Sequence, residues 1–184
     1  MVQSIYSRNV TVESNHCISS AGTPISFISG TRHKCIGNKV DKVFWNVSCI
    51  GMNSTHSIVR GNIVTASVGN ISCLTLGHEP VIFRADYTVA ENNTLHSEGC
   101  RSLIIQNGCG IIMSNNECSC VINMDALEMT SGAIVASGRA EGIFDLSLMD
   151  NRLNATGDGN RGCITYRGTG RVLIQGNTIV QTGE

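Results

Sequence analysis

The chain has 184 residues, of which 41% are hydrophobic and 15% are charged, and its formal net charge is −1. This length suits one domain with a sizeable core, and the hydrophobic fraction excludes a disordered tail. The near-neutral charge without a basic stripe argues against a nucleic-acid partner. No apolar run is long enough for a membrane span. With 4% aromatic residues, the core must be built mainly from aliphatic side chains.

Short runs of β-forming residues follow one another along the chain, each bounded by Gly, Asn, Ser or Asp. Helical periodicity is nearly absent, and only Met124–Met129 could form a helical turn. The runs expected to form strands are, in chain order, Ser26–Ser29, Lys42–Val47, Val81–Phe83, Ser102–Gln106, Gly110–Met113, Ala133–Ala136 and Arg171–Gln175.

Two segments of the chain align with each other. One runs from Phe83 to Asn93, the other runs from Phe144 to Asn154, and each is followed by a Gly-Cys pair. A second, shorter similarity relates Gly61-Asn-Ile-Val to Gly176-Asn-Thr-Ile-Val. Repeats of this kind indicate an array whose units cannot each bury a core alone.

A parallel β-helix explains this array best. Asn-Gly and Asp-Gly pairs, the usual hairpin turns, occur only at 107–108 and 158–159, too few for a hairpin architecture. In stacked coils an inward Asn can bond its counterparts above and below, and Gly permits tight corners. We therefore predict an all-β, right-handed parallel β-helix of about six to eight coils over residues 1–184, as a single domain. Phe83 should lie near the column of Phe144, and Asn93 and Asn154 should occupy equivalent corners.

Residues 131–164 resemble a known family. Ser131-Gly-Ala-Ile, Phe144, Asn154-Ala and Gly162-Cys-Ile are similar to the repeat of chlamydial-type polymorphic membrane proteins. That family belongs to the right-handed β-helix superfamily, which also includes pectate lyases. The resemblance covers residues 80–180 best, and it implies an extracellular, adhesive or structural role without assigning any catalytic residue.

The sequence also points to an extracellular compartment. Six sites match the N-glycosylation pattern Asn-x-Ser/Thr, more than the roughly three that chance would give in a chain this rich in Asn, Ser and Thr. The start, residues 1–7, lacks the basic and apolar regions of a signal peptide, and a strand pattern lies close to the end. We therefore expect a fragment or a module that stacks end to end. The predicted glycosylation sites are Asn9, Asn46, Asn53, Asn70, Asn92 and Asn154.

Nine cysteines support the same compartment, because this number is high for a cytosolic protein. Zinc-finger spacing is absent, and the five histidines are scattered, so we predict no metal site. Some of the cysteines could instead stack in the interior as small hydrophobic residues. The candidates for disulfides are Cys17, Cys35, Cys49, Cys73, Cys100, Cys109, Cys118, Cys120 and Cys163.

No catalytic motif is recognisable. The nearest match to the acidic calcium site and basic residue of a pectate lyase is Asp145, Asp150, Arg152 and Asp158, but Asp158 lies in a Gly-Asp-Gly turn that suits backbone capping. The single tryptophan, Trp45, gives little support to a sugar-binding cleft. We predict no catalytic residues and no cofactor.

The leading functional prediction is an extracellular or cell-surface structural glycoprotein. Its β-helix would form a segment of a surface fibre, filament or stalk by end-to-end stacking, because open β-helix ends pair readily with another copy. The expected partners are further copies of the chain, together with glycans. Two other classes stay open: an adhesin or carbohydrate-binding surface module, and a polysaccharide lyase or hydrolase.

Overall fold

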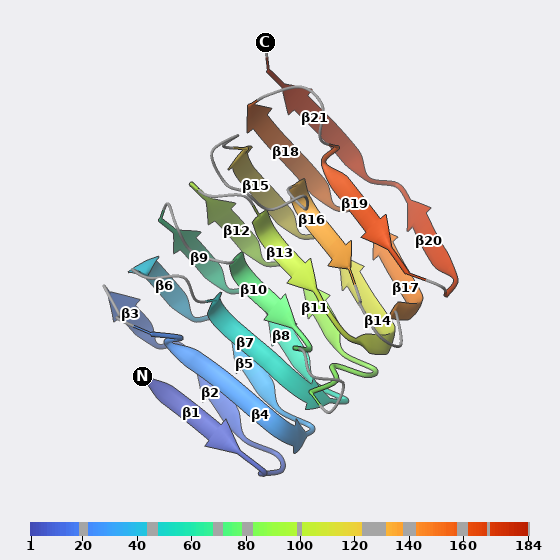
Figure 1. Ribbon diagram of the computed structural model, residues 1–184. Coiled ribbons are helices and arrows are strands. Elements are labelled where there is room, and N and C mark those ends of the chain that lie inside the picture. The colour runs from blue at the N-terminus through green and yellow to red at the C-terminus, as the bar shows by residue number, and fades with distance from the viewer. Residues whose placement is uncertain are drawn as a thin grey trace.

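A computed structural model describes residues 1–18, 22–43, 48–67, 72–78, 83–98, 101–122, 132–137, 143–157, 162–168 and 170–183. These residues form an all-β solenoid made of three parallel sheets with seven strands each, and none of them is helical. The two termini lie at opposite ends of the stack (Figure 1). The prediction of an all-β parallel β-helix is confirmed.

The chain passes through the three sheets in strict rotation, so that each coil contributes one strand to every sheet. The first sheet contains β1 (Val2–Ile5), β4 (Ile25–Thr31), β7 (Ser48–Thr55), β10 (Ser72–Leu76), β13 (Arg101–Ile105), β16 (Gly132–Ser137) and β19 (Ile164–Arg167). The second contains β2 (Thr11–Glu13), β5 (Lys34–Ile36), β8 (Ile58–Arg60), β11 (Val89–Glu91), β14 (Gly108–Ser114), β17 (Ile143–Met149) and β20 (Val172–Gln175). The third contains β3 (His16–Ile18), β6 (Lys39–Val43), β9 (Ile63–Ala66), β12 (Thr94–Ser97), β15 (Glu117–Ile122), β18 (Arg152–Gly157) and β21 (Thr178–Thr182).

The expected strands are found where the chain is described, except at Phe83, which forms only an isolated bridge. Ser26–Ser29 lies within β4, Ser102–Gln106 largely within β13, and Arg171–Gln175 largely within β20. The runs at 110–113 and 133–136 lie within β14 and β16. Of the run at 42–47, residues 42 and 43 end β6 and the rest falls outside the described residues, as do residues 81–82 and 124–129.

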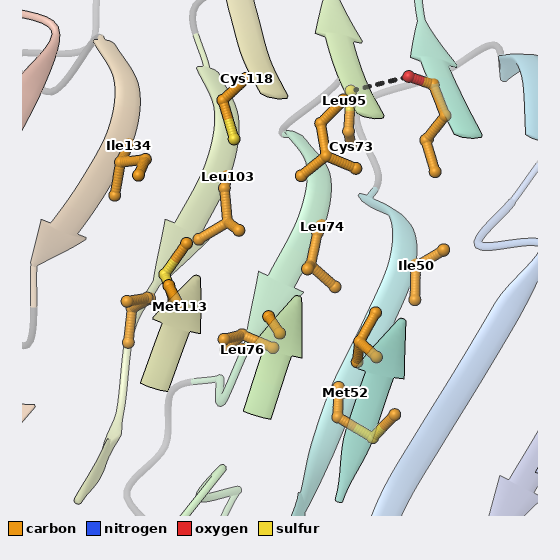
Figure 2. Packing of buried hydrophobic residues seen from close by; sticks show 14 of the residues in the cluster. Ile50, Met52, Cys73, Leu74, Leu76, Leu95, Leu103, Met113, Cys118 and Ile134 are labelled. Carbon is orange, nitrogen blue, oxygen red and sulfur yellow. Dashed lines mark hydrogen bonds between the residues drawn. The ribbon is translucent and has the colours of Figure 1, made fainter. Parts of the chain in front are cut away.

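The core is a set of columns, each made of the residues that occupy one position in successive coils. Ile50, Leu74, Leu103 and Ile134 are paired in register along the first sheet and are fully buried. Exposed and buried side chains alternate along β18, which is the two-residue period of β-structure, whereas every residue of β10 and β13 is buried. Figure 2 shows members of these columns pointing into the same interior space. Because a coil alone buries little, each coil is stabilised mainly by its two neighbours.

A column of asparagines runs the length of the solenoid at the corner between the second and third sheets. The N–H and the Nδ2 of Asn93 both donate to Oδ1 of Asn116, at 3.0 and 2.9 Å, while Nδ2 also donates to the carbonyl of Val59 in the preceding coil, at 3.0 Å. Each amide between the two end asparagines of this column therefore ties three coils together. This asparagine ladder consists of Asn15, Asn38, Asn62, Asn93, Asn116, Asn151 and Asn177.

The residue before every ladder asparagine has a left-handed backbone, with φ between 53° and 67°. This conformation turns the chain sharply enough to point the next side chain inward, and Gly, Asn, Asp and Ser adopt it at the lowest cost. Three of the seven positions are glycine. The full set is Ser14, Gly37, Gly61, Asn92, Asn115, Asp150 and Gly176.

The predicted register of the repeat was wrong by three residues. Asn93 is equivalent to Asn151, whereas Asn154 lies on the exposed face of β18, paired with Ser119. Likewise, Phe144 pairs with Cys109, and Phe83 forms an isolated antiparallel bridge with His78 outside that column. Coils differ in length because their corners differ, so a fixed offset between two similar segments does not give their alignment. Aligning Gly61-Asn62 with Gly176-Asn177 gives the correct register, because both asparagines belong to the ladder.

Candidate functional site

The outer surface carries three of the predicted glycosylation sites. Asn9 and Asn92 are exposed at corners with left-handed backbones, and Asn154 points outward from the third sheet. Asn154 therefore has no conflict between facing inward and carrying a glycan. Asn53 is only partly exposed, and its Oδ1 is buried without a partner among the described residues. Asn46 and Asn70 lie outside the described residues.

The acidic residues considered as a catalytic cluster do not converge. Asp145 forms an ion pair with Arg171 at 2.8 Å, and Asp150 occupies the corner after β17. Asp145 lies in β17 and Asp150 in the turn that follows it, so the two residues are five positions apart along the chain. Arg152 faces outward from the third sheet, and Asp158 falls outside the described residues. Among the described residues this arrangement is a surface ion pair and a turn.

The prediction of a disulfide framework is not supported. All eight described cysteines are free thiols, and Cys100 lies outside the described residues. Six of them are buried, and Cys73 and Cys118 lie in the interior near Leu74 and Leu95 (Figure 2). The other reading, in which cysteines stack as small hydrophobic residues, fits these positions. The free thiols are Cys17, Cys35, Cys49, Cys73, Cys109, Cys118, Cys120 and Cys163.

Burial lowers the reactivity expected of four of the buried thiols. It raises the pKa of Cys35, Cys49 and Cys118 to about 12, and it raises the pKa of Cys73 well above its ordinary value. Because the thiolate is the reactive form, a maleimide should label the partly exposed Cys17 and Cys109 in the folded protein before any of the buried four. Peptide-resolved mass spectrometry after timed labelling checks this order, and equal labelling of Cys49 and Cys17 under native conditions contradicts it.

His33 is a buried histidine that lies between β4 and β5. The side chain of His33 is fully buried, its ring stacks on Phe27 with a centroid distance of 5.0 Å, and its Nδ1 accepts the N–H of Val10 at 3.2 Å. Its Nε2 has no partner among the described residues. Gly30 provides the space, because a Cβ there would lie 2.0 Å from this nitrogen. Sequence reasoning treated His33 only as one of several scattered histidines.

His33 should make the stability of the protein depend on pH. Burial lowers its pKa below the ordinary value of about 6.5. The unfolded chain therefore takes up a proton at a higher pH than the folded protein does. The stabilisation is complete above about pH 6.5 and is lost as the pH falls toward the lowered pKa, with a slope of at most about 1.4 kcal/mol per pH unit.

Urea unfolding followed by circular dichroism between pH 7.5 and 5 measures this dependence. His33→Gln removes the titrating ring and should flatten the curve in this window. A native curve that is flat here, or a variant curve parallel to it, contradicts the role of His33. Asp41 does not interfere, because hydrogen bonds from Lys39 and His16 lower its pKa, which places its contribution in more acidic solution.

Neither a metal centre nor a spanning helix emerges from the described residues. Nowhere in these ranges do three or more His, Cys, Asp or Glu side chains gather in a group that could hold a metal ion. The described part of the chain also contains no helix that could span a bilayer. No protein-family model matches this sequence, and no curated protein is significantly similar to it. The chain's own geometry must therefore carry the functional argument.

Proposed function

We propose that this chain is an extracellular structural glycoprotein whose β-helix forms one segment of a surface fibre, filament or stalk that grows by end-to-end stacking. The observation that carries the proposal is the solvent exposure of the inward-facing columns in the last described coil. Ile174 and Ile179 continue the columns of Leu148 and Leu153. Leu148 and Leu153 are 1% and 0% exposed, whereas Ile174 and Ile179 are each 51% exposed.

Such half-covered aliphatic residues favour association. A parallel β-helix buries each inward side chain between the coils above and below it, so an end coil leaves its inward side chains and its backbone N–H and C=O groups unpaired. No described residue covers Ile174 or Ile179 to the depth found one coil earlier. Burying both would release about 25 cal/mol for each Å² of apolar surface removed from water. The strands of another coil would cover both side chains and pair with the exposed backbone groups.

The glycoprotein part of the proposal is supported by the exposed positions of Asn9, Asn92 and Asn154. When the chain is expressed through a eukaryotic secretory pathway, we expect glycans at these three sites. Asn53 should be modified least, because its side-chain amide is only partly exposed. Glycopeptide mass spectrometry with site assignment tests this. Unmodified asparagine at all three exposed sites would reject the secretory assignment, and full occupancy of Asn53 would contradict the predicted ranking.

Negative-stain electron microscopy of the purified chain tests the structural role. We expect rods with a constant width and variable lengths, several times the length of one molecule. Analytical ultracentrifugation across a concentration series should show a mass that increases with protein concentration. A uniform population of monomers at every concentration would reject the proposed assembly.

A further inference from the structure

The asparagine ladder has a direction, and this direction defines how two copies can meet. At every internal step, the N–H and Nδ2 of one asparagine donate to the Oδ1 of the asparagine in the next coil toward the C-terminus. The reverse bond is not found at any step between described ladder residues. One end of the ladder is therefore left with an acceptor and the other with donors.

The acceptor end is Asn15. Its N–H and Nδ2 both donate to Oδ1 of Asn38, at 3.0 Å each, and its own Oδ1 accepts no hydrogen bond from the described residues. The donor end is Asn177, whose Nδ2 donates to the carbonyls of Leu148 and Gln175. The N–H of Asn177 has no acceptor among the described residues. Elsewhere in the ladder, the same groups bind the Oδ1 of a following asparagine.

We propose that the β19–β21 end of one copy docks onto the β1–β3 end of a second copy, with Asn177 donating to the Oδ1 of Asn15 so that the asparagine ladder continues across the junction. This inference rests on the proposed function and specifies its partner and its register. A second copy is the occupant because it offers the missing acceptor on the same surface as strands of matching direction. The contact is heterologous, so each addition exposes the same end again.

The register also predicts a second bond across the junction. Within the molecule, the Nδ2 of each ladder asparagine donates to the carbonyl three residues before the preceding ladder asparagine: Asn38 to Val12, Asn62 to Cys35, and so on. Asn15 is the first ladder asparagine that the structure describes, and its Nδ2 donates to the carbonyl of Glu13. At the junction, the carbonyl three residues before Asn177 belongs to Ile174. Asn15 of the second copy should therefore donate to Ile174.

The apolar columns agree with this register. Continuing each column by one coil places Ile174 over Val12, Ile179 over Cys17, and Ile164 over Val2.

The outward columns agree as well, because they bring no like charges together. Thr178 would lie beside His16, and Gln175 would lie beside Glu13. The second copy thus covers the exposed inward side chains of the last coil without an electrostatic penalty.

A cross-linking experiment tests the register of the junction. His16 and Thr178 occupy one exposed column at opposite ends of the rod, and at the junction they should lie one coil spacing apart, about 4.8 Å. The double variant H16C/T178C should form a head-to-tail disulfide ladder of dimers, trimers and longer species on a non-reducing gel. The control T94C/T178C uses the same column, but Thr94 lies in the middle of the rod, so it should remain monomeric on the gel.

A charge placed in the junction supplies the second test. Ile179→Lys should keep the monomer folded, because the side chain is half exposed there, yet it should shorten or abolish the rods, because the junction would bury the ammonium group. Val121→Lys is the matched control on the lateral surface, with 41% exposure, and it should leave rod length unchanged. Circular dichroism confirms that both variants fold.

The outcomes separate the two proposals. If the unmodified chain forms no rods, both the junction and the proposed function are rejected. If rods form, but H16C/T178C cross-links no better than its control and Ile179→Lys leaves rod length unchanged, the junction alone is rejected.

Discussion

Replacing Asn93 with alanine is expected to lower the free energy of unfolding by about 3–5 kcal/mol, a large part of the stability of a typical domain. Asn93 is buried, and its Oδ1 accepts from both the N–H and the Nδ2 of Asn62. Alanine would leave the N–H of Asn62 without a partner in the interior. It would also reduce the Nδ2 of Asn62 to its single bond with the carbonyl of Cys35 and remove the bond to the carbonyl of Val59. Each buried group left in this state costs about 1–3 kcal/mol. Urea unfolding monitored by circular dichroism gives the measurement.

Asn154→Ala is the matched control for this experiment. Asn154 was the residue that the sequence comparison aligned with Asn93, yet it points into solvent. Its replacement should change stability by no more than about 0.5 kcal/mol. Similar losses for the two variants would show that the register of the asparagine ladder is wrong.

Gly77→Ala should prevent folding or cost about 2–5 kcal/mol. Gly77 has a φ of +67°, where a side chain costs about 1–2 kcal/mol. Its Cβ would also lie 2.1 Å from the carbonyl oxygen of Asn107, a backbone atom that cannot rotate away. Overpacking of this kind adds about 1–3 kcal/mol or more. The yield of folded protein and its thermal midpoint report the effect.

Gly61→Ala separates backbone strain from the clash. Gly61 has nearly the same φ, +64°, but no atom lies within 4 Å of the added Cβ. Only the conformational cost of about 1–2 kcal/mol remains, so this variant should fold and show a modest decrease in its thermal midpoint. If Gly61→Ala were as damaging as Gly77→Ala, contact with the Asn107 backbone could not be the cause.

The architecture was predictable from the sequence because it depends on local patterns. Short runs bounded by turn residues, few hairpin turns and a recurring Asn indicate stacked parallel coils. The register was less accessible. Ladder steps vary from 23 to 35 residues, so aligning Phe83 with Phe144 over a fixed distance brought the wrong asparagines together. The better signal was a two-residue pattern, in which a residue suited to a left-handed backbone precedes Asn, as in Gly61-Asn62 and Asp150-Asn151.

The candidate site was less predictable than the fold. Cysteine count alone favoured disulfides, but the outcome depends on where each thiol lies relative to its neighbours, and that follows from the register. Cys35 sits in the same inward column as Val12 and Val59, where a small apolar side chain is needed. Similarly, nothing near His33 in the sequence indicates that its ring packs on Phe27 with Gly30 making room.

The unequal ladder steps also bear on how this molecule can change. The entropy of closing a loop grows only with the logarithm of its length, so a 35-residue step costs about 0.4 kcal/mol more than a 23-residue step. The hydrogen bonds of the asparagine ladder keep neighbouring coils in register, whatever the number of residues between two successive ladder asparagines. Peptides can thus be inserted into the segments between ladder asparagines at almost no cost in the free energy of folding. The rod then becomes a scaffold that displays inserted sequences at intervals of one coil.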